Sequence, residues 1–290
     1  MNITRLLLKT DYDLFPSKFD DYIEFGNNIG STFLPYFNLP NSIIPITDDD
    51  THDMLISTLE FEKESNLDKQ MSSDTDDTNS NRVVYGTFFS QLSHKFSVFN
   101  DLSFEELQSE LFLDTCEEYF SLVDKFNSPI FTPVKADVNG NITKLRRKRN
   151  ENVLKFQTLF AIVNDEIESQ TTRIRNSATD ALLWLERAFE FLSEFLHQFS
   201  QGDKTLVDAV NKAYELSLKQ HHGLLARSVF SIALRAVPNN EEFIRSLAIN
   251  PTDASEPLFE QQVLDEMFEQ ASNISSVLRK ITFFYSKHGL

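Results

Sequence analysis

The sequence is poor in the residues that characterise cross-linked and turn-rich folds. Its 290 residues include one cysteine, 7 glycines and 9 prolines. The single cysteine, Cys116, excludes an intramolecular disulfide and any zinc site built from several cysteines. The low glycine and proline content argues against collagen and against a β-sandwich or barrel. We expect a helical protein with a sizeable core, because 41% of the residues are hydrophobic and 27 residues are Phe.

Positive charge and long apolar runs are also scarce. The chain has 27 Lys and Arg against 44 Asp and Glu, and its formal net charge of −17 has the wrong sign for a general nucleic-acid binder. No apolar run reaches the roughly 18 residues of a membrane span, and Leu6-Leu7-Leu8 is too short for a signal-peptide core. We therefore expect a soluble, cytoplasmic protein that binds no nucleic acid.

The charge is distributed unevenly along the chain. Residues 1–90 hold 6 basic and 16 acidic residues, a net of −10, whereas the other 200 residues hold 21 against 28, a net of −7. The most biased stretch, around residues 47–81, cannot bury enough apolar surface to offset its ordering entropy, so we expect a partly disordered acidic linker there. The pattern predicts an N-terminal extension at residues 1–100 and a helical domain at residues 101–290.

Helical periodicity dominates the second part of the chain, and no alternation typical of strands competes with it. This pattern predicts an all-α fold of packed helical layers. We expect one helix to begin at about Asp137. Further helices are expected over residues 156–168, 178–199, 205–219 and 259–285.

Three polar side chains share one face of an expected helix. Asp137, Asn141 and Lys144 are spaced by four and then three residues, which places them within one another's reach. A carboxylate, an amide and an ammonium together offer acceptors and donors for a polyhydroxylated head group. The alternative is a solvated helix start in which Asp137 stabilises the N-terminus through the helix dipole.

Two further segments carry candidate binding residues. Trp184, the only tryptophan, shares a narrow helix face with Asp180, and its indole is either a stacking platform for a sugar or part of the core. The adjacent His221 and His222 point to different sides of a helix, which excludes a metal pair at the usual spacing of four residues. No metal, cofactor or nucleophile motif accompanies them, so we expect neither a cofactor nor an enzyme.

Taken together and in this order, these segments resemble the glycolipid transfer protein family. Residues 128–144 carry its Asp-x3-Asn-x2-Lys head-group motif, residues 181–189 match its tryptophan helix, and residues 211–223 match its histidine helix. The resemblance covers roughly residues 105–290. It implies a two-layer, all-α helical sandwich with a single lipid site between the layers.

The resemblance also implies a role for each matching residue. Asp137, Asn141 and Lys144 would bind sugar hydroxyls, Trp184 would stack on the first sugar, and His222 would donate to the amide carbonyl of the ceramide. Asp137 would also accept from the amide N–H, and Tyr285 is the late candidate for the family's C-terminal sugar-contacting tyrosine. The apolar family positions that line the chain pocket map to Phe131, Val134, Phe191, Phe195, Leu218, Phe230 and Phe243.

Two positions favour a neutral sugar over a phosphate, and two others depart from the family pattern. Relatives that carry ceramide phosphate have Lys at the position of Asn141 and Arg at that of Trp184, and a phosphate requires fixed cations. Asp180 replaces an apolar residue one turn before the tryptophan, where it would accept from a sugar hydroxyl or repel an anionic head group. Leu224 replaces an aromatic residue at the membrane interface.

A basic run follows the head-group motif and has more than one interpretation. Arg146, Arg147, Lys148 and Arg149 form a solvated helix face, a nuclear-localisation-like patch or, as we prefer, a contact with an anionic membrane surface.

Together, the residues and the resemblance predict a protein that binds a glycosphingolipid with a simple neutral sugar and transfers it between membranes without vesicles. Its contact with membranes is expected to be peripheral and transient. Transfer of ceramide phosphate is one alternative. A lipid-sensing regulatory protein, with residues 1–100 binding a protein partner, is the other.

Overall fold

The computed structural model describes residues 84–290, and the acidic linker expected around residues 47–81 lies outside the described residues. Within residues 84–290 the chain forms helices and no strand, with two isolated β-bridges, Thr87–Ala248 and Gln108–Thr158. The α-helices are α4 (Ser109–Phe120), α5 (Thr132–Glu151), α6 (Leu159–Glu168), α7 (Ala178–Ser200), α8 (Leu206–Leu216), α9 (Leu224–Ala233), α10 (Asn240–Ser246) and α11 (Phe259–His288).

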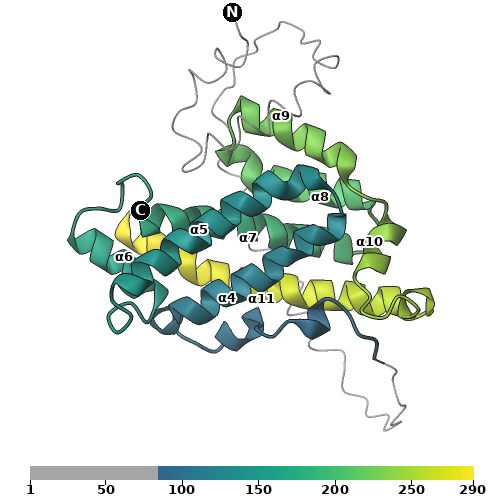
Figure 1. The fold of residues 1–290 in the computed structure, drawn as a ribbon, viewed down its shortest axis with the longest axis horizontal. Coiled ribbons are helices and arrows are strands. Elements are labelled where there is room, and N and C mark those ends of the chain that lie inside the picture. Colours follow the sequence, from purple (N-terminus) through teal and green to yellow (C-terminus); the bar gives the residue numbers. More distant parts are fainter. Residues whose placement is uncertain (1–83) are drawn as a thin grey trace, which may run out of the picture. The chain divides into compact units, whose positions relative to one another are not determined.

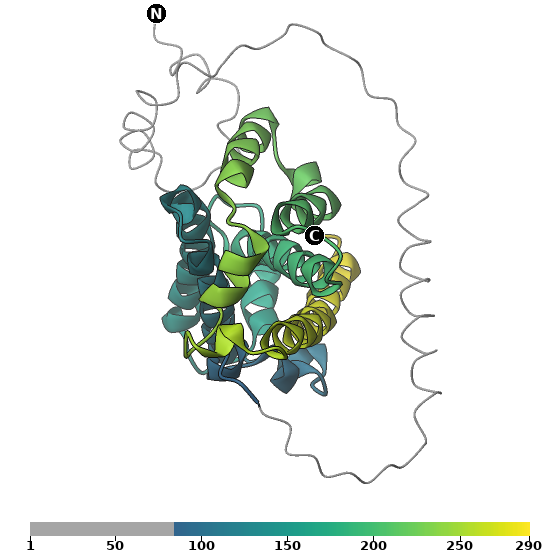
Figure 2. The ribbon, with the colours of Figure 1, turned by 90° about the vertical axis from the view of Figure 1, so that its right-hand side faces the viewer.

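The helices are arranged in two layers. The long helix α7 packs against α6, α8 and α11 in one layer, and it also packs against α5, which lies beside α4 in the other (Figure 1). Figure 2 shows α4 and α5 on one side of the molecule and α8 and α11 on the other. The expectation of an all-α, two-layer helical fold is confirmed.

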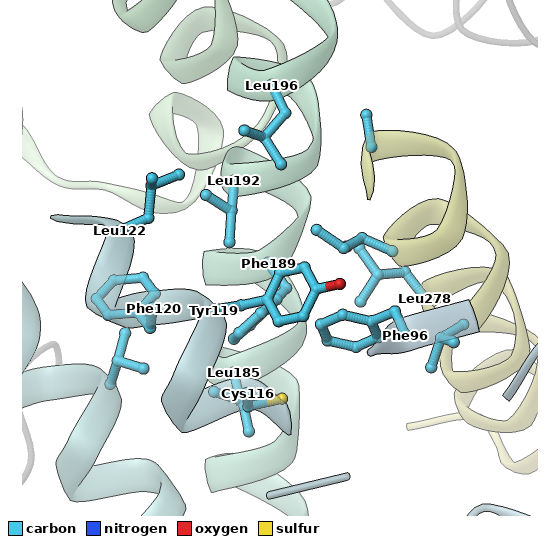
Figure 3. Close-up of a cluster of buried hydrophobic side chains, with 14 of the residues drawn as sticks. Phe96, Cys116, Tyr119, Phe120, Leu122, Leu185, Phe189, Leu192, Leu196 and Leu278 are labelled. Carbon is cyan, nitrogen blue, oxygen red and sulfur yellow. The ribbon is translucent and has the colours of Figure 1, made fainter. Parts of the chain in front are cut away.

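The core lies where α7 meets α4 and α11. Leu185, Phe189, Leu192 and Leu196 on successive turns of α7 are buried against residues of the other helices, in agreement with the 3.6-residue periodicity (Figure 3). Tyr119 of α4 belongs to the same cluster, and its buried hydroxyl donates to Gln270 Oε1 of α11 at 2.5 Å. Because a buried phenol keeps its hydrogen bond, the core is both apolar and fully paired at this point.

Helix α5 begins earlier than the sequence pattern predicts. Its first residue is Thr132, not about Asp137, and Pro133 lies in its first turn. Proline suits that position, because its missing N–H would have no partner within the helix and its φ angle is already helical. Asp137 and Lys144 therefore lie within a rigid helix and not at its frayed start.

The N-terminal end of α7 is fixed by three side chains. The Ser177 hydroxyl accepts from the Asp180 N–H at 3.0 Å and caps the helix. The carboxylate of Glu166, in α6, accepts from the N–H groups of Ala178 and Thr179, both at 2.8 Å, and from the Thr179 hydroxyl at 2.6 Å. Since a carboxylate at a helix N-terminus is also stabilised by the helix dipole, the first turn of α7 has a defined position.

The helical unit extends further toward the N-terminus than the expected boundary at residue 101. Phe88, Phe89, Phe96 and Phe99 are buried in its core. The Lys280 ammonium of α11 donates to the carbonyls of Phe99, Asn100 and Leu102 at 2.5–3.0 Å and holds this segment in place. The unit therefore includes Val84–Leu290.

Candidate functional site

The polar face of α5 forms as the residue spacing predicts. Asn141 and Lys144 are 2% and 8% exposed, and the Lys144 ammonium donates to Asn141 Oδ1 at 3.1 Å. Asp137 lies on the same face and is partly buried. Buried polar groups at the surface of a helix layer are costly unless they find partners, so this face is built to meet a polar ligand or another polar element.

Asp180 of α7 joins this face across the two layers. Burial raises the pKa of Asp137, the Lys144 charge opposes that rise, and the Asp180 charge adds to it. Burial lowers the pKa of Lys144, whereas Asp137 and Asp180 raise it. Two carboxylates and one ammonium thus interact electrostatically. Together with the amide of Asn141 they form what we term the polar cluster: Asp137, Asn141, Lys144 and Asp180.

Trp184 lies one turn after Asp180 and faces the histidine segment. Its indole is partly buried, and its ring centroid lies 6.5 Å from that of His222, with the two planes inclined by 23°. The Arg187 guanidinium lies over the indole, with its Cζ 4.7 Å from the ring centroid. The indole is therefore neither sealed in the core nor remote from the imidazole.

His222 follows the short helix η8 (Leu218–His221) and precedes α9. Its Nδ1 lies 3.2 Å from the Tyr214 hydroxyl, and Tyr214 itself stacks on Phe230 with ring centroids 3.6 Å apart. Burial lowers the pKa of His222, and the charges of Arg227 and Arg187 lower it further, so the imidazole is neutral near neutral pH. If Tyr214 donates to Nδ1, the proton resides on Nε2, which is then a donor for a ligand carbonyl.

Tyr285 does not join this group. It is 4% exposed, and its hydroxyl donates to the Thr179 carbonyl at 2.7 Å. The proton of the phenol is committed to the backbone of α7, so the sugar contact expected for Tyr285 is not supported. Tyr285 instead helps to fix the helix turn that carries Asp180.

The apolar positions separate into three groups. Phe131, Phe195 and Phe243 surround Phe126, with ring centroids 5.1, 5.8 and 5.3 Å from it. Phe191, Leu218 and Phe230 are partly buried. Val134 is 44% exposed on the first turn of α5, so the structure does not place it among the interior side chains.

The basic run of α5 is mostly engaged within the fold, and the membrane contact expected for it stays a prediction. Arg146 forms ion pairs with Asp114 and with Glu117 of α4, the latter at 2.7 Å. Arg149 pairs with Glu110 of α4 at 2.8 Å, and Lys148 pairs with Asp165 of α6 at 2.9 Å. These three cations connect α5 to its neighbours, while Arg147 is exposed.

Helix α9 presents apolar side chains outward. Leu224 is 80% exposed, Leu225 and Val229 are also exposed, and Ala233 is the one buried residue of this helix. In the part of the chain that the structure describes, no helix is long and apolar enough to cross a bilayer. No group of three or more His, Cys, Asp or Glu side chains in residues 84–290 is arranged to hold a metal ion.

Sequence reasoning missed Tyr214 and Arg187. Tyr214 precedes His222 by eight residues, and the two meet because α8 ends at Leu216 and the chain changes direction before η8. No helical spacing signals this contact. Arg187 follows Trp184 by three residues, a spacing that does signal proximity on a helix.

One acidic residue of α7 makes stability depend on pH. The pKa of Glu190 is raised from 4.5 to about 7, mainly by burial and then by the charges of Glu186 and Glu194, while Arg187 opposes the rise. Since the folded state binds this proton more tightly than the unfolded state, stability decreases as the pH rises from about 4.5 through 7. We expect Glu190→Gln to raise the free energy of unfolding at pH 8 by about 1 kcal/mol, a value reduced for solvent screening, and to have almost no effect at pH 4.

Urea unfolding followed by circular dichroism at the two pH values measures this difference. Glu256→Gln, at an exposed loop position, is the matched control. An equal effect of Glu190→Gln at pH 4 and pH 8 would contradict the assignment.

The architecture and the site together define the class of protein. The solved structure of FAPP2, which selects simple glycosphingolipids using the GLTP-fold, superposes with a TM-score of 0.66 at 37% sequence identity, over 70% of this chain and 97% of that one. The human ceramide-1-phosphate transfer protein shares the fold, with a TM-score of 0.58 at 19% identity over 67% of this chain and 93% of that one. The protein therefore belongs to the class of lipid transfer proteins that have a two-layer helical fold.

The family follows from the sequence comparisons. The glycolipid transfer protein family model matches residues 107–248. The glycolipid transfer protein of Xenopus tropicalis is 30% identical over 190 residues, which are 63% of this chain and 88% of that protein. The chain belongs to the glycolipid transfer protein family.

Longer relatives contain this region as one part. The pleckstrin homology domain-containing family A member 8 of Mus musculus is 37% identical over 210 residues, which are 72% of this chain and 40% of that protein. The corresponding protein of Homo sapiens is 36% identical over 209 residues, again 40% of its length. The chain thus matches about 40% of the length of these curated relatives.

Proposed function

We propose that this protein binds a glycosphingolipid with a simple neutral sugar and transfers it between membranes, without catalysing a reaction. The observation that supports this proposal is the convergence of the polar cluster on α5 and α7, the accessible indole on α7 and the neutral imidazole directly after η8. A sugar ring offers hydroxyls to the polar cluster and an apolar face to the indole. The ceramide amide offers its carbonyl to the imidazole.

Transfer needs no energy source under this proposal. Each CH2 group removed from water stabilises the bound state by about 0.8 kcal/mol, so a sphingolipid does not leave a bilayer for water alone. The lipid chains would enter between the layers near Phe131, Phe195 and Phe243, where they exchange one apolar environment for another. Selectivity then comes from the polar cluster, because a lipid without a sugar leaves its buried groups without partners.

A ceramide-phosphate cargo fits the site less well. A phosphate is best bound by several fixed cations. Lys144 is the one cation of the polar cluster, and it is already balanced by Asp137 and Asp180. Trp184 adds an apolar surface where the phosphate-carrying relatives have Arg.

The exposed face of α9 provides the membrane contact in this proposal. Leu224, Leu225 and Val229 would enter the apolar part of the interface, and Arg147 remains available for anionic lipids. Contact through a few side chains is weak, which suits a peripheral and transient association.

An intervesicle transfer assay with fluorescent glucosylceramide and fluorescent ceramide phosphate tests this function. We expect the full chain to transfer the first and to be nearly inactive toward the second. A variant that lacks residues 1–83 distinguishes a carrier from a regulatory protein, and this deletion leaves Phe88 and Phe96 in the core. A carrier retains transfer, whereas loss of transfer with retained lipid binding would favour the regulatory alternative, in which a partner binds the N-terminal extension.

We expect Asp180 to lower the affinity of the site for lipids with anionic sugars relative to lipids with neutral sugars. It adds a second carboxylate to the polar cluster, and it acts on both Asp137 and Lys144. We expect Asp180→Asn to raise the affinity for sulfated galactosylceramide about tenfold relative to glucosylceramide, because about 1.4 kcal/mol of repulsion is removed.

Competition between the two lipids in the transfer assay measures this ratio. Asp203→Asn, in the exposed loop after α7, removes the same charge away from the site and is the control. An unchanged ratio in Asp180→Asn would show that Asp180 has no part in selectivity.

A further inference from the structure

Arg187 lies against the indole of the site, and its spacing of three residues from Trp184 is the sequence feature that signals this contact. Its Cζ lies 4.7 Å from the centroid of the Trp184 ring, within the range of a cation–π interaction. The spacing of three residues explains the contact, because a helical side chain leans back over the turn that precedes it. The guanidinium therefore covers part of the indole surface.

The guanidinium of Arg187 lies in an acidic environment. The carboxylates of Glu186, Asp180 and Glu190 on α7 attract it. On the other side, its charge reaches His221 and His222, whose pKa values it lowers. A flexible side chain with attractive groups behind it and an aromatic ring beneath it loses little further entropy when a ligand binds.

The indole has two faces, and a guanidinium on one of them has a geometric consequence. We propose that Arg187 is a positioning residue that backs one face of Trp184 and leaves the opposite face as the single platform for a sugar ring. This inference rests on the proposed function, because the ligand of the platform is the sugar of a glycosphingolipid. Arg187 would not touch the sugar, and it acts through the orientation of the indole.

The same position links the indole to the histidine. Burial lowers the pKa of His222, the charge of Arg227 lowers it further, and the charge of Arg187 adds the smallest part. One side chain therefore acts on both the indole platform and the imidazole donor. Arg187 would hold both in the state that binds the ligand.

The only tryptophan of the chain makes this inference directly measurable, because all indole fluorescence comes from Trp184. We compare the full-length wild type with Arg187→Met, which keeps a long side chain without the charge, and with Arg187→Lys, which keeps the charge without the planar group. Arg245→Met, at an exposed position of α10, is the control. Circular dichroism and thermal unfolding verify that each variant is folded.

The first readout is acrylamide quenching of the lipid-free protein, and the second is the affinity for glucosylceramide. We expect Arg187→Met to increase the quenching constant about twofold and to weaken glucosylceramide binding about 3- to 30-fold, the range that a cation–π contact accounts for. Arg187→Lys should recover part of both effects, and Arg245→Met should match the wild type.

Unchanged quenching and unchanged affinity in Arg187→Met, with normal binding by the wild type, would overturn this inference alone. Tighter binding by Arg187→Met would also overturn it, since the guanidinium would then occupy the face that the sugar needs. A wild type that binds no glucosylceramide would overturn the proposed function, and the inference with it.

Discussion

Replacing Asp137 by Asn should reduce intervesicle transfer of glucosylceramide about 100-fold or more, while helicity stays unchanged. The carboxylate of Asp137 is partly buried in the polar cluster, and in the proposed complex it accepts hydrogen bonds from sugar hydroxyls and from the ceramide amide. Asn offers an N–H where the ligand also presents a donor, and two charge-assisted hydrogen bonds are worth about 3 kcal/mol or more together. Burial raises the pKa of Asp137, so its charged form is not favoured by folding and the neutral Asn should not destabilise the protein.

The transfer rate of a fluorescent glucosylceramide measures this effect. Asn139→Ala, at an exposed position of the same helix, is the matched control and should transfer as the wild type does. Wild-type transfer by Asp137→Asn would remove Asp137 from the site.

Replacing Trp184 by Ala should lower the rate of intervesicle glucosylceramide transfer about tenfold to 100-fold, because the lipid is bound more weakly. The indole supplies a flat apolar surface of the kind that a sugar ring covers, and aromatic contacts of this type contribute about 1–3 kcal/mol. Arg187 would lose its ring partner in the same variant, which adds to the loss. Trp184→Phe keeps a smaller platform and should lie between the wild type and Trp184→Ala.

The rate of lipid transfer is the measurement here, because Trp184→Ala removes the only intrinsic tryptophan signal. Unfolding temperatures separate a binding defect from a folding defect. If Trp184→Ala transfers glucosylceramide at the wild-type rate, the indole is a packing residue and the sugar platform does not exist.

Much of the fold could be predicted because it depends on local patterns. Helix α7 begins at Ala178, as the apolar periodicity predicts, and α11 begins at Phe259 as expected. The spacing of Asp137, Asn141 and Lys144 determined their shared face, because residues three and four apart are neighbours on any helix. Such signals need no knowledge of the other layer.

The features that could not be predicted depend on contacts between distant segments. Phe88 and Phe96 belong to the core through packing that composition does not reveal. Arg146 and Arg149 look like a free basic patch in the sequence, yet their partners on α4, Asp114 and Glu110, lie 32 and 39 positions earlier. Tyr285 has the residue type that the site would use, but the register of α11 turns its hydroxyl toward the Thr179 carbonyl.

The side chains of the candidate site come from both helical layers. Helix α5 supplies the polar face, and α7 supplies a carboxylate, an indole and the guanidinium behind it. The hydrogen bonds that Glu166 and Tyr285 form with the first turn of α7 keep these groups in register. The candidate side chains thus lie on two helices and, for His222, directly after η8, which favours a pre-organised site.

Native mass spectrometry of the full-length protein, purified from its own cells, tests the central claim most directly. We expect a population of protein that carries one lipid molecule with the mass of a monoglycosylceramide, and we expect this population to disappear in Asp137→Asn. Recovery of a ceramide phosphate or a glycerophospholipid in its place, or of the same lipid in Asp137→Asn, would contradict the account.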